Sequence, residues 1–434
     1  MNEPRVALKA IQVDGLFGRR DPLRIELDKR RPTVLTGANG SGKSTILGLV
    51  NAVSKSDATV LATAPYERLE LEFETLPPIA LERISPNEVI ATWNNHEGLY
   101  SASPFLNDLP TWALTHLEDH GYDAVEAVKG FSPAANGFGA TYKEYRDARS
   151  TLEAIRDDGR PFGSPAWMLE FSELFPVLFV TDQRLVAGGS RGRAKSTRLA
   201  VDAASADLAE RLQTADSDYA RASQQRERRF PQEVIKTMLS AGNVSERELT
   251  RLIEELDGRR ESLRRVGLLD GDDHYEPSVE PQGLQSSDIR KVLHSVFRAS
   301  RDNLKVLEEY EQRLSAFKDF LDERFFPKAI ELNRSHGIRF SFPDGKSIRP
   351  RQLSSGEQQM VVLAYEILFR AQPNTLVIID EPEMSLHVLW QDTLIQDLLR
   401  MGAPSDLQFL VATHSPMILA GHKDLERALP GATR

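Results

Sequence analysis

The stretch Gly37-Ala-Asn-Gly-Ser-Gly-Lys-Ser44 is a glycine-rich loop with the residue spacing of a phosphate-binding loop. An apolar run, Thr33–Thr36, precedes it, and residues 45–53 have a helical pattern. This order of strand, loop and helix places backbone N–H groups around a bound anion. We therefore predict a nucleoside triphosphate site in which Lys43 reaches the β and γ phosphates and Ser44 binds Mg²⁺. The predicted nucleotide contacts are Gly37, Asn39, Gly40, Ser41, Gly42, Lys43, Ser44 and Thr45.

A second motif, Leu376-Val-Ile-Ile-Asp-Glu381, lies near the other end of the chain. Its apolar residues predict a buried strand that carries Asp380 at its carboxyl end, where open α/β sheets bind ligands. Asp380 can hold the Mg²⁺ ion, and Glu381 can accept a proton from an attacking water as general base. A surface acidic pair is the alternative, and the apolar run disfavours it. If both motifs serve one site, the fold must return the C-terminal segment to the sheet that holds the phosphate loop.

The segment Leu353-Ser-Ser-Gly-Glu-Gln-Gln359 precedes a helical pattern over residues 360–370. Its backbone N–H groups form a helix N-terminus suited to an anion. The segment resembles the signature motif of the ABC-type ATPases, whose familiar form is Leu-Ser-Gly-Gly-Gln. In that superfamily the motif caps the γ-phosphate of ATP bound to a second subunit. The resemblance implies an ATP-sandwiched homodimer, or a higher oligomer, with contacts in trans from Ser354, Ser355, Gly356 and Glu357.

Two further segments resemble motifs of the same superfamily. Ala412-Thr-His-Ser-Pro416 follows an apolar run over residues 409–411, and the resemblance implies that His414 polarises the γ-phosphate or positions water. Ser385-Leu-His387 resembles the D-loop. A lone histidine is more often structural, but the apolar run before it favours a functional role for His414.

Gln183 is the candidate glutamine of the Q-loop, which would sense Mg²⁺ and water. It follows a predicted buried strand, Val177–Val180, and lies between the two halves of the site. Asp182 and Arg184 are equally placed, and polar loop residues are common. The predicted Mg²⁺ ligands are therefore Ser44, Gln183 and Asp380.

The forms of these motifs resemble the SMC, RecF and OLD-like branch of the superfamily more than a transporter subunit. Gly15-Leu-Phe-Gly18, which precedes the first ATPase strand, indicates the same branch. Two departures are mild: Ala38 replaces the common proline of the phosphate loop, and Val388 replaces the proline that usually follows Ser-Leu-His. OLD-family nucleases continue past the switch histidine, whereas this sequence stops 20 residues after His414. We therefore expect no nuclease domain in this chain.

Composition excludes several classes of site. The 434 residues include no cysteine, so disulfides, thiolate metal sites and a cysteine nucleophile are excluded. No apolar run approaches the roughly 20 residues that cross a bilayer, and the N-terminus lacks an apolar leader, so we expect a cytoplasmic protein without a membrane partner. The net charge of −10 does not indicate DNA as a general partner. Three arginine-rich groups could form local basic surfaces, although solvated faces balanced by acids are favoured: Arg191, Arg193, Lys195 and Arg198; Arg226, Arg228 and Arg229; Arg259, Arg260, Arg264 and Arg265.

The patterns along the chain predict an α/β fold of the ABC-type ATPase head, with a mixed or parallel sheet covered by helices on both faces and an antiparallel β patch. We predict the N-terminal half of the head over residues 1–198, a helical insert over 199–330 and the C-terminal half over 331–434. The patterns predict antiparallel strands over residues 67–74, 79–84 and 89–93, a helix over 142–156 and a hairpin turn at 343–345.

The insert has a helical pattern over residues 203–326, broken at Pro231, Gly242 and an acidic loop over 271–274. Its last helix carries a heptad seam of two heptads, formed by Leu307, Tyr310, Leu314, Phe317 and Leu321. A short helical hairpin, coiled coil or bundle fits this pattern, and an ordinary amphipathic core helix is an equal alternative.

Together these features predict a slow Mg²⁺-dependent ATPase that converts ATP and water to ADP and phosphate, with Lys43, Glu381 and His414 as catalytic residues. The architecture resembles the stand-alone ATPase subunits of anti-phage systems such as PARIS, Septu and some retrons. That resemblance implies a sensor or regulatory subunit that holds or activates a separately encoded nuclease or toxin until a trigger, such as a phage protein, is sensed. A DNA repair or recombination ATPase of RecF or SMC type is the alternative, and a transporter-associated ATPase is a third.

Overall fold

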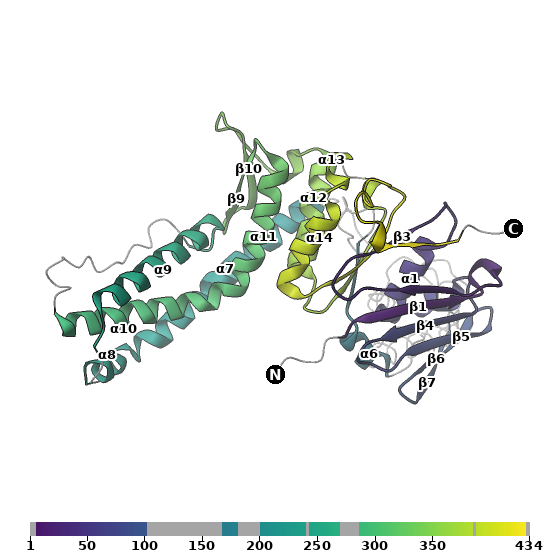
Figure 1. The fold of residues 1–434 in the computed structure, drawn as a ribbon, viewed down its shortest axis with the longest axis horizontal. Helices are drawn as coiled ribbons and strands as arrows, with labels where there is room; N and C mark the ends of the chain where they lie inside the picture. The colour runs from purple at the N-terminus through teal and green to yellow at the C-terminus, as the bar shows by residue number, and fades with distance from the viewer. Residues whose placement is uncertain are drawn as a thin grey trace, which may run out of the picture. The chain divides into compact units, whose positions relative to one another are not determined.

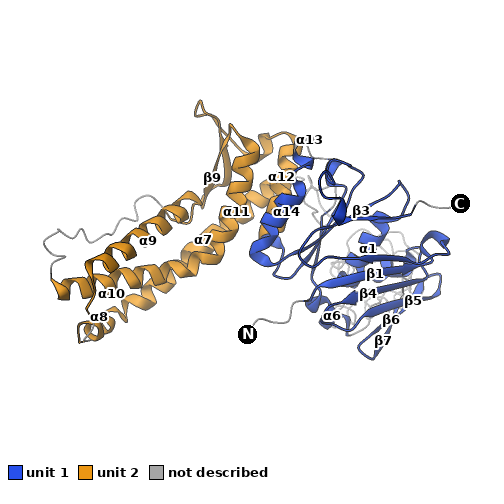
Figure 2. Ribbon diagram, in the orientation of Figure 1, with its two compact units in different colours: residues 1–198, 369–434 blue, residues 199–368 orange. Residues whose placement is uncertain are grey.

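The structure is a computed structural model that describes residues 6–101, 167–180, 200–239, 243–269, 286–384 and 388–430. The chain forms two compact units, which Figure 2 distinguishes by colour. Unit 1 comprises residues 1–198 and 369–434, and unit 2 comprises residues 199–368. The sequence predicted a second boundary at residue 330. Residues 331–368 instead group with the helices of unit 2, because β9 packs on α11 and β10 packs on α7.

A parallel sheet of five strands holds the two ends of the chain together in unit 1. Its order is β14-β3-β13-β12-β8, and every neighbouring pair is parallel. The N-terminal strand β3 pairs with the C-terminal strand β13, with Val34 opposite Val411. The predicted return of the C-terminal segment to the sheet of the phosphate loop is therefore confirmed. The strands are β3 (Thr33–Thr36), β8 (Val177–Val180), β12 (Leu376–Asp380), β13 (Gln408–Ala412) and β14 (Glu426–Ala428).

A six-stranded antiparallel sheet forms the second layer of unit 1, and it includes the predicted β patch. Its order is β2-β1-β4-β5-β6-β7. The last strand was not predicted, because its sequence, His-Glu-Gly-Leu-Tyr-Ser, lacks apolar alternation. The turn before it is Asn94-Asn95, whose positive φ values of 47° and 66° suit a tight hairpin. The strands are β1 (Leu8–Asp14), β2 (Leu23–Glu26), β4 (Arg68–Phe73), β5 (Ile79–Ser85), β6 (Glu88–Trp93) and β7 (His96–Ser101).

One hydrophobic core joins the two sheets of unit 1 around helix α1 (Lys43–Lys55). Ile46, Leu49 and Val50 of this helix are fully buried, and the core includes residues of both sheets. Among the residues that the structure describes, the other α-helices of the unit are α2 (Ala58–Thr63), α6 (Met168–Leu174), α13 (Val388–Gln391) and α14 (Leu394–Gly402). The confirmed class is thus an α/β head with a parallel sheet and an antiparallel sheet.

A buried glutamine also connects the two sheets. Gln408, on β13, is 5% exposed. Its Oε1 accepts a hydrogen bond from the Leu8 N–H at 3.0 Å, and its Nε2 donates to the Leu8 carbonyl at 2.8 Å and the Asp28 carbonyl at 3.1 Å. One amide therefore satisfies three backbone groups that lie about 400 positions away in sequence.

Unit 2 consists of a helical bundle and a small antiparallel sheet of order β11-β10-β9. Helix α10 packs against α7, α8 and α9, and Figure 1 shows these helices side by side. The elements are α7 (Ala200–Glu227), α8 (Phe230–Leu239), α9 (Glu246–Arg265), α10 (Ser287–Leu304), α11 (Glu308–Phe325), β9 (Ala329–Asn333), β10 (Gly337–Ser341), β11 (Ser347–Ile348) and α12 (Ser355–Tyr365).

The predicted break at Pro231 and the heptad seam lie among the described residues of unit 2. The chain turns at Arg228–Arg229, and Pro231 lies in the first turn of α8, where its missing N–H removes no helical hydrogen bond. Of the five seam residues, four are buried and Tyr310 is half-buried. The seam therefore packs inside the bundle.

The hairpin predicted at 343–345 joins β10 and β11.

Some predictions concern residues outside the described ranges. They are the helix over 142–156, the basic group at 191–198, the helical break at Gly242 and the acidic loop at 271–274. Within the described ranges, no helix combines the length and apolarity required for a membrane span.

Replacement of Gln408 by leucine should lower the free energy of unfolding by about 2–4 kcal/mol, because the buried Leu8 N–H and two carbonyls lose their partner. The matched control is Gln12→Leu on β1, where the half-buried side chain makes one hydrogen bond, to Asp14 at 3.3 Å. This control should cost less than about 1 kcal/mol. Urea denaturation measures both values, and equal losses would contradict the bridging role of Gln408.

Candidate nucleotide-binding site

The phosphate loop lies between β3 and α1 and has the backbone that its glycines permit. Gly40 and Gly42 have positive φ values of 77° and 102°. A β-carbon on Gly42 would lie 2.6 Å from Leu16 Cδ2, so both conformation and space require glycine there. Lys43 begins α1 and is 5% exposed. The N-terminus of a long buried helix thus faces the loop, as an anion site requires.

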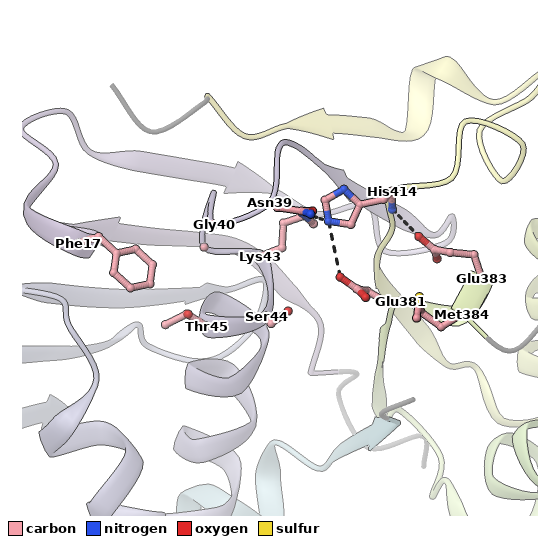
Figure 3. A pocket seen from close by; sticks show the side chains of 11 residues that line it. Phe17, Asn39, Gly40, Lys43, Ser44, Thr45, Glu381, Glu383, Met384 and His414 are labelled. Atoms are coloured by element: carbon pink, nitrogen blue, oxygen red, sulfur yellow. Dashed lines mark hydrogen bonds and ion pairs between the residues drawn. The ribbon is translucent and has the colours of Figure 1, made fainter. Parts of the chain in front are cut away.

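A pocket of about 590 Å³ opens at this loop, within the size range of small-molecule sites. It brings residues of both sequence motifs together within unit 1 (Figure 3). Gly37 and Ser41 lie in the loop and Asp380 ends β12, but these three do not line the pocket. The lining residues are Phe17, Asn39, Gly40, Gly42, Lys43, Ser44, Thr45, Glu381, Glu383, Met384 and His414.

The Lys43 ammonium is held between the phosphate loop and the C-terminal half of the site. Its Nζ donates to the Gly37 carbonyl at 3.0 Å and lies 2.7 Å from Nε2 of His414. Because an ammonium can only donate, Nε2 accepts, and the imidazole proton is on Nδ1. Burial lowers the pKa of Lys43, while the charges of Glu381, Asp380 and Glu383 oppose that shift. The lysine therefore lies close to three carboxylates, whose negative charge a bound cation would offset.

Glu381 directs its carboxylate toward the same histidine. Its φ of 47° is left-handed, which is a strained conformation for a residue other than glycine. The Glu381 N–H donates to the Ala412 carbonyl at 2.9 Å, and its Oε1 lies 3.5 Å from Nε2 of His414. The strained turn at the end of β12 thus brings the predicted base beside His414.

Three lining residues were missed in the sequence. Glu383 Oε1 accepts from the His414 N–H at 2.5 Å and from the Ser415 N–H at 3.2 Å. Its signal was the second acidic residue of Asp-Glu-Pro-Glu. Phe17 has a φ of 55° and is 52% exposed, and Met384 is 68% exposed. The signal of Phe17 was an aromatic residue in a glycine-flanked turn. Met384 had no signal that sequence could supply.

The segment that resembles the signature motif lies in unit 2, at the start of α12. Ser354 is its N-cap and forms a capping box with Glu357. Glu357 Oε2 accepts from the Ser354 N–H at 2.9 Å and from its hydroxyl at 3.0 Å, and Lys328 donates to Oε1. Burial raises the pKa of Glu357, but the hydrogen bonds from Lys328 and Ser354 outweigh it and hold that pKa below its usual value. Both oxygens of Glu357 are thus engaged within its own chain, while Ser354 and Ser355 are exposed.

Gln183 and the segment 385–387 lie outside the described residues. The structure therefore brings together the phosphate loop, Glu381 and His414, and it places Asp380 at the adjacent strand end.

A family model described as "AAA domain, putative AbiEii toxin, Type IV TA system" matches residues 207–420. The Retron Ec83 probable ATPase of Escherichia coli is 26% identical over 160 residues, which cover 30% of this chain and 29% of the relative. The Retron Vc95 probable ATPase of Vibrio cholerae is 32% identical over 87 residues, covering 18% of this chain and 16% of the relative.

A solved Smc head domain from Pyrococcus furiosus, bound to the C-terminal domain of ScpA, aligns over 96% of this chain and 91% of that chain, with 14% identity and a TM-score of 0.37. In sequence, this chain spans less than a third of each retron relative. The chain resembles the AbiEii-type AAA domain and the probable ATPases of retrons, so the predicted resemblance to ATPases of defence systems is confirmed.

Glu357→Ala should lower the free energy of unfolding by about 1–2 kcal/mol at pH 7, because Ser354 and Lys328 lose their acceptor. Glu357→Gln is the matched control; it keeps the capping box and should lose less. Because the folded pKa is depressed, the loss in the Ala variant is full above the unfolded pKa, near 4.3, and shrinks as pH falls through the folded pKa. Urea denaturation at pH 7 and pH 3 tests this; equal losses at both values would exclude the charged contact.

Proposed function

We propose that the unit 1 pocket binds ATP with Mg²⁺ and that the chain hydrolyses it slowly to ADP and phosphate. The observation that carries this proposal is the convergence of Lys43, Glu381 and His414, from opposite ends of the chain, in one pocket at the start of a buried helix. Similarity to two retron ATPases supports the same activity.

The residues present fit a Mg²⁺ ion. The Ser44 hydroxyl lines the pocket, and the Asp380 carboxylate is near enough to act on the charge of Lys43. Hydroxyl and carboxylate oxygens are the ligands that Mg²⁺ prefers. We propose Ser44, Asp380 and Gln183 as its ligands. When bound, the ion would neutralise charge on the β and γ phosphates.

Each remaining residue then has a defined task in the proposed reaction. Without nucleotide, the Lys43 ammonium contacts His414. When ATP binds, Lys43 exchanges this contact for one with the phosphates. Glu381 accepts the proton of the attacking water. His414, released from Lys43, turns toward the γ-phosphate and steadies the transition state.

We further propose that the signature segment of a second copy completes the site, with contacts from Ser354, Ser355, Gly356 and Glu357. Support comes from the exposure of Ser354 and Ser355 at the N-terminus of α12, where backbone N–H groups favour an anion. In this proposal Lys328 has a secondary task, since it neutralises the one carboxylate at that N-terminus. The active form is a homodimer or a higher oligomer of such dimers.

The biological role that we propose is a sensor or regulatory ATPase of an anti-phage defence complex, which holds or activates an effector nuclease or toxin on a separate chain. The similarity to retron ATPases and to the AbiEii-type family model supports this role. A phage protein is the proposed trigger.

Contacts of several arginines in the described residues weigh against the DNA repair alternative. Several arginines of the candidate basic faces are paired: Arg259 with Glu311 at 3.2 Å, Arg264 with Glu261 at 3.7 Å, and Arg265 with Asp319 at 2.5 Å. Arg226 donates to the Ala299 carbonyl at 3.2 Å. These contacts agree with solvated faces balanced by acids.

Glu381→Gln should retain ATP binding and lower turnover at least about 100-fold, because the amide cannot accept the proton of the attacking water. Lys43→Ala is the companion variant and should lose nucleotide binding. Phosphate release and binding of a fluorescent ATP analogue measure the two properties. Unchanged hydrolysis in the Glu381 variant would rule out its role as base.

ATP and Mg²⁺ should drive the Glu381→Gln variant into dimers, and Ser355→Glu in that background should weaken dimerisation at least about tenfold by charge repulsion. An acidic residue in the first helical turn favours the helix itself, so folding should be unharmed. Ser335→Glu adds the same charge at another exposed serine of unit 2 and serves as control. Light scattering after gel filtration measures the masses; dimers that persist with Ser355→Glu would contradict the proposed contact.

A further inference from the structure

Two carboxylates from one short turn contact His414 at different ends of the residue. Glu381 Oε1 lies 3.5 Å from the ring nitrogen Nε2, whereas Glu383 Oε1 accepts the backbone N–H of His414 at 2.5 Å. Figure 3 shows Glu381 on the ring side and Glu383 on the backbone side. Glu383 therefore holds the backbone of this histidine, whereas its ring nitrogen accepts from Lys43 and Glu381 lies beside the ring.

The backbone side of this arrangement is firmly fixed. Glu383 Oε1 also accepts from the Ser415 N–H at 3.2 Å, and that N–H is shared with the Thr413 hydroxyl at 2.9 Å. The Ser415 hydroxyl donates to Gln391 Oε1 at 2.6 Å. Hydrogen bonds to a carboxylate are about twice as strong as neutral ones. Glu383 thus anchors the segment from which the imidazole extends.

The ring side is built to change. Nε2 of His414 accepts from Lys43, the same ammonium that must turn to the phosphates of a bound nucleotide. When that contact breaks, the imidazole ring has to move while the backbone of His414 stays in place. The carboxylate of Glu383, bound to the backbone N–H groups, supplies this fixed point.

The position of Glu383 has a free-energy cost, because one of its carboxylate oxygens is buried. Its Oε2 is buried and has no hydrogen-bond partner in the described part of the chain, although the residue lines the pocket. Burying a carboxylate oxygen without a partner is unfavourable, so the two backbone contacts of Oε1 have to offset it. A side chain needed only for packing would not require a charge there.

We propose that Glu383 is a positioning residue for ATP hydrolysis, which fixes the backbone of His414 and Ser415 so that the imidazole reaches first Lys43 and then the γ-phosphate. This inference rests on the proposed ATPase function. Misplacement of a catalytic group by about 1 Å can cost about 100-fold in rate. Loss of the anchor therefore lowers kcat by more than it changes ATP affinity.

The test is a double-mutant cycle in the full chain with four variants: Glu383→Ala, Glu383→Gln, His414→Ala and the double Glu383→Ala/His414→Ala. Glu383→Ala should lower kcat about 10–100-fold, with a smaller change in KM and in ATP affinity. Glu383→Gln keeps an oxygen for both N–H groups and should retain activity within about fivefold. In the His414→Ala background, Glu383→Ala should cost less than about twofold, because both residues act through one imidazole.

A purely structural role would give a different pattern, with a lower melting temperature and a further loss of kcat in the His414→Ala background. Multiplicative losses, an unchanged kcat in Glu383→Ala, or a Gln variant as impaired as the Ala variant would each overturn the inference. ATP hydrolysis by the wild-type chain and by Glu381→Gln distinguishes failure of this inference from failure of the proposed function. If the wild type hydrolyses ATP and Glu381→Gln does not, a negative cycle rejects only the role of Glu383. Absence of wild-type hydrolysis rejects the proposed function itself.

Discussion

The parallel pairing of β3 with β13 is the interaction on which the rest of unit 1 depends. It places a strand from the first 36 residues beside one that begins at Gln408. The phosphate loop leaves one strand and His414 follows the other, so their proximity results from the register of Val34 opposite Val411. Pairing of β13 with β12 then adds Glu381 at the neighbouring strand end. A site of this kind cannot form from either half of the chain alone.

Long-range pairing of this type requires support elsewhere, because closing so large a loop costs chain entropy. The support is a single core that includes both sheets and α1, together with the Gln408 amide that satisfies backbone groups of the N-terminal sheet. Packing against α1 keeps the helix N-terminus in place behind the loop. The strained backbone of Glu381 persists because β12, β13 and their hydrogen bonds fix the residues on either side.

Sequence predicted the parts of this arrangement that local chemistry determines. Three strands of the parallel sheet were predicted at their observed bounds, because continuous apolar runs followed by polar residues are typical of buried parallel strands. They are Thr33–Thr36, Val177–Val180 and Leu376–Asp380. Strand β7 was not predicted, since its pairing is decided by the Asn94-Asn95 turn and not by apolar alternation. The unit boundary near 368 depends on packing of β9 and β10 against helices, which sequence does not show.

The residues of the candidate site divide in the same way. Lys43, Glu381 and His414 occur in motifs whose chemistry can be read directly, and the pocket contains all three. Glu383 and Phe17 were missed because their roles depend on a backbone contact and a left-handed turn that only three dimensions reveal. Glu357 was predicted to contact a nucleotide in trans. Within its own chain, its carboxylate binds Ser354 and Lys328.

In the proposed site, one nucleotide contacts both ends of the chain at once. Amide hydrogen exchange with and without ATP and Mg²⁺ can test this, since each end can be followed separately. We expect slower exchange in residues 37–45 and, in the same sample, in residues 381–384 and 413–415. Protection limited to one of these segments, or found elsewhere in the chain, would contradict a shared site.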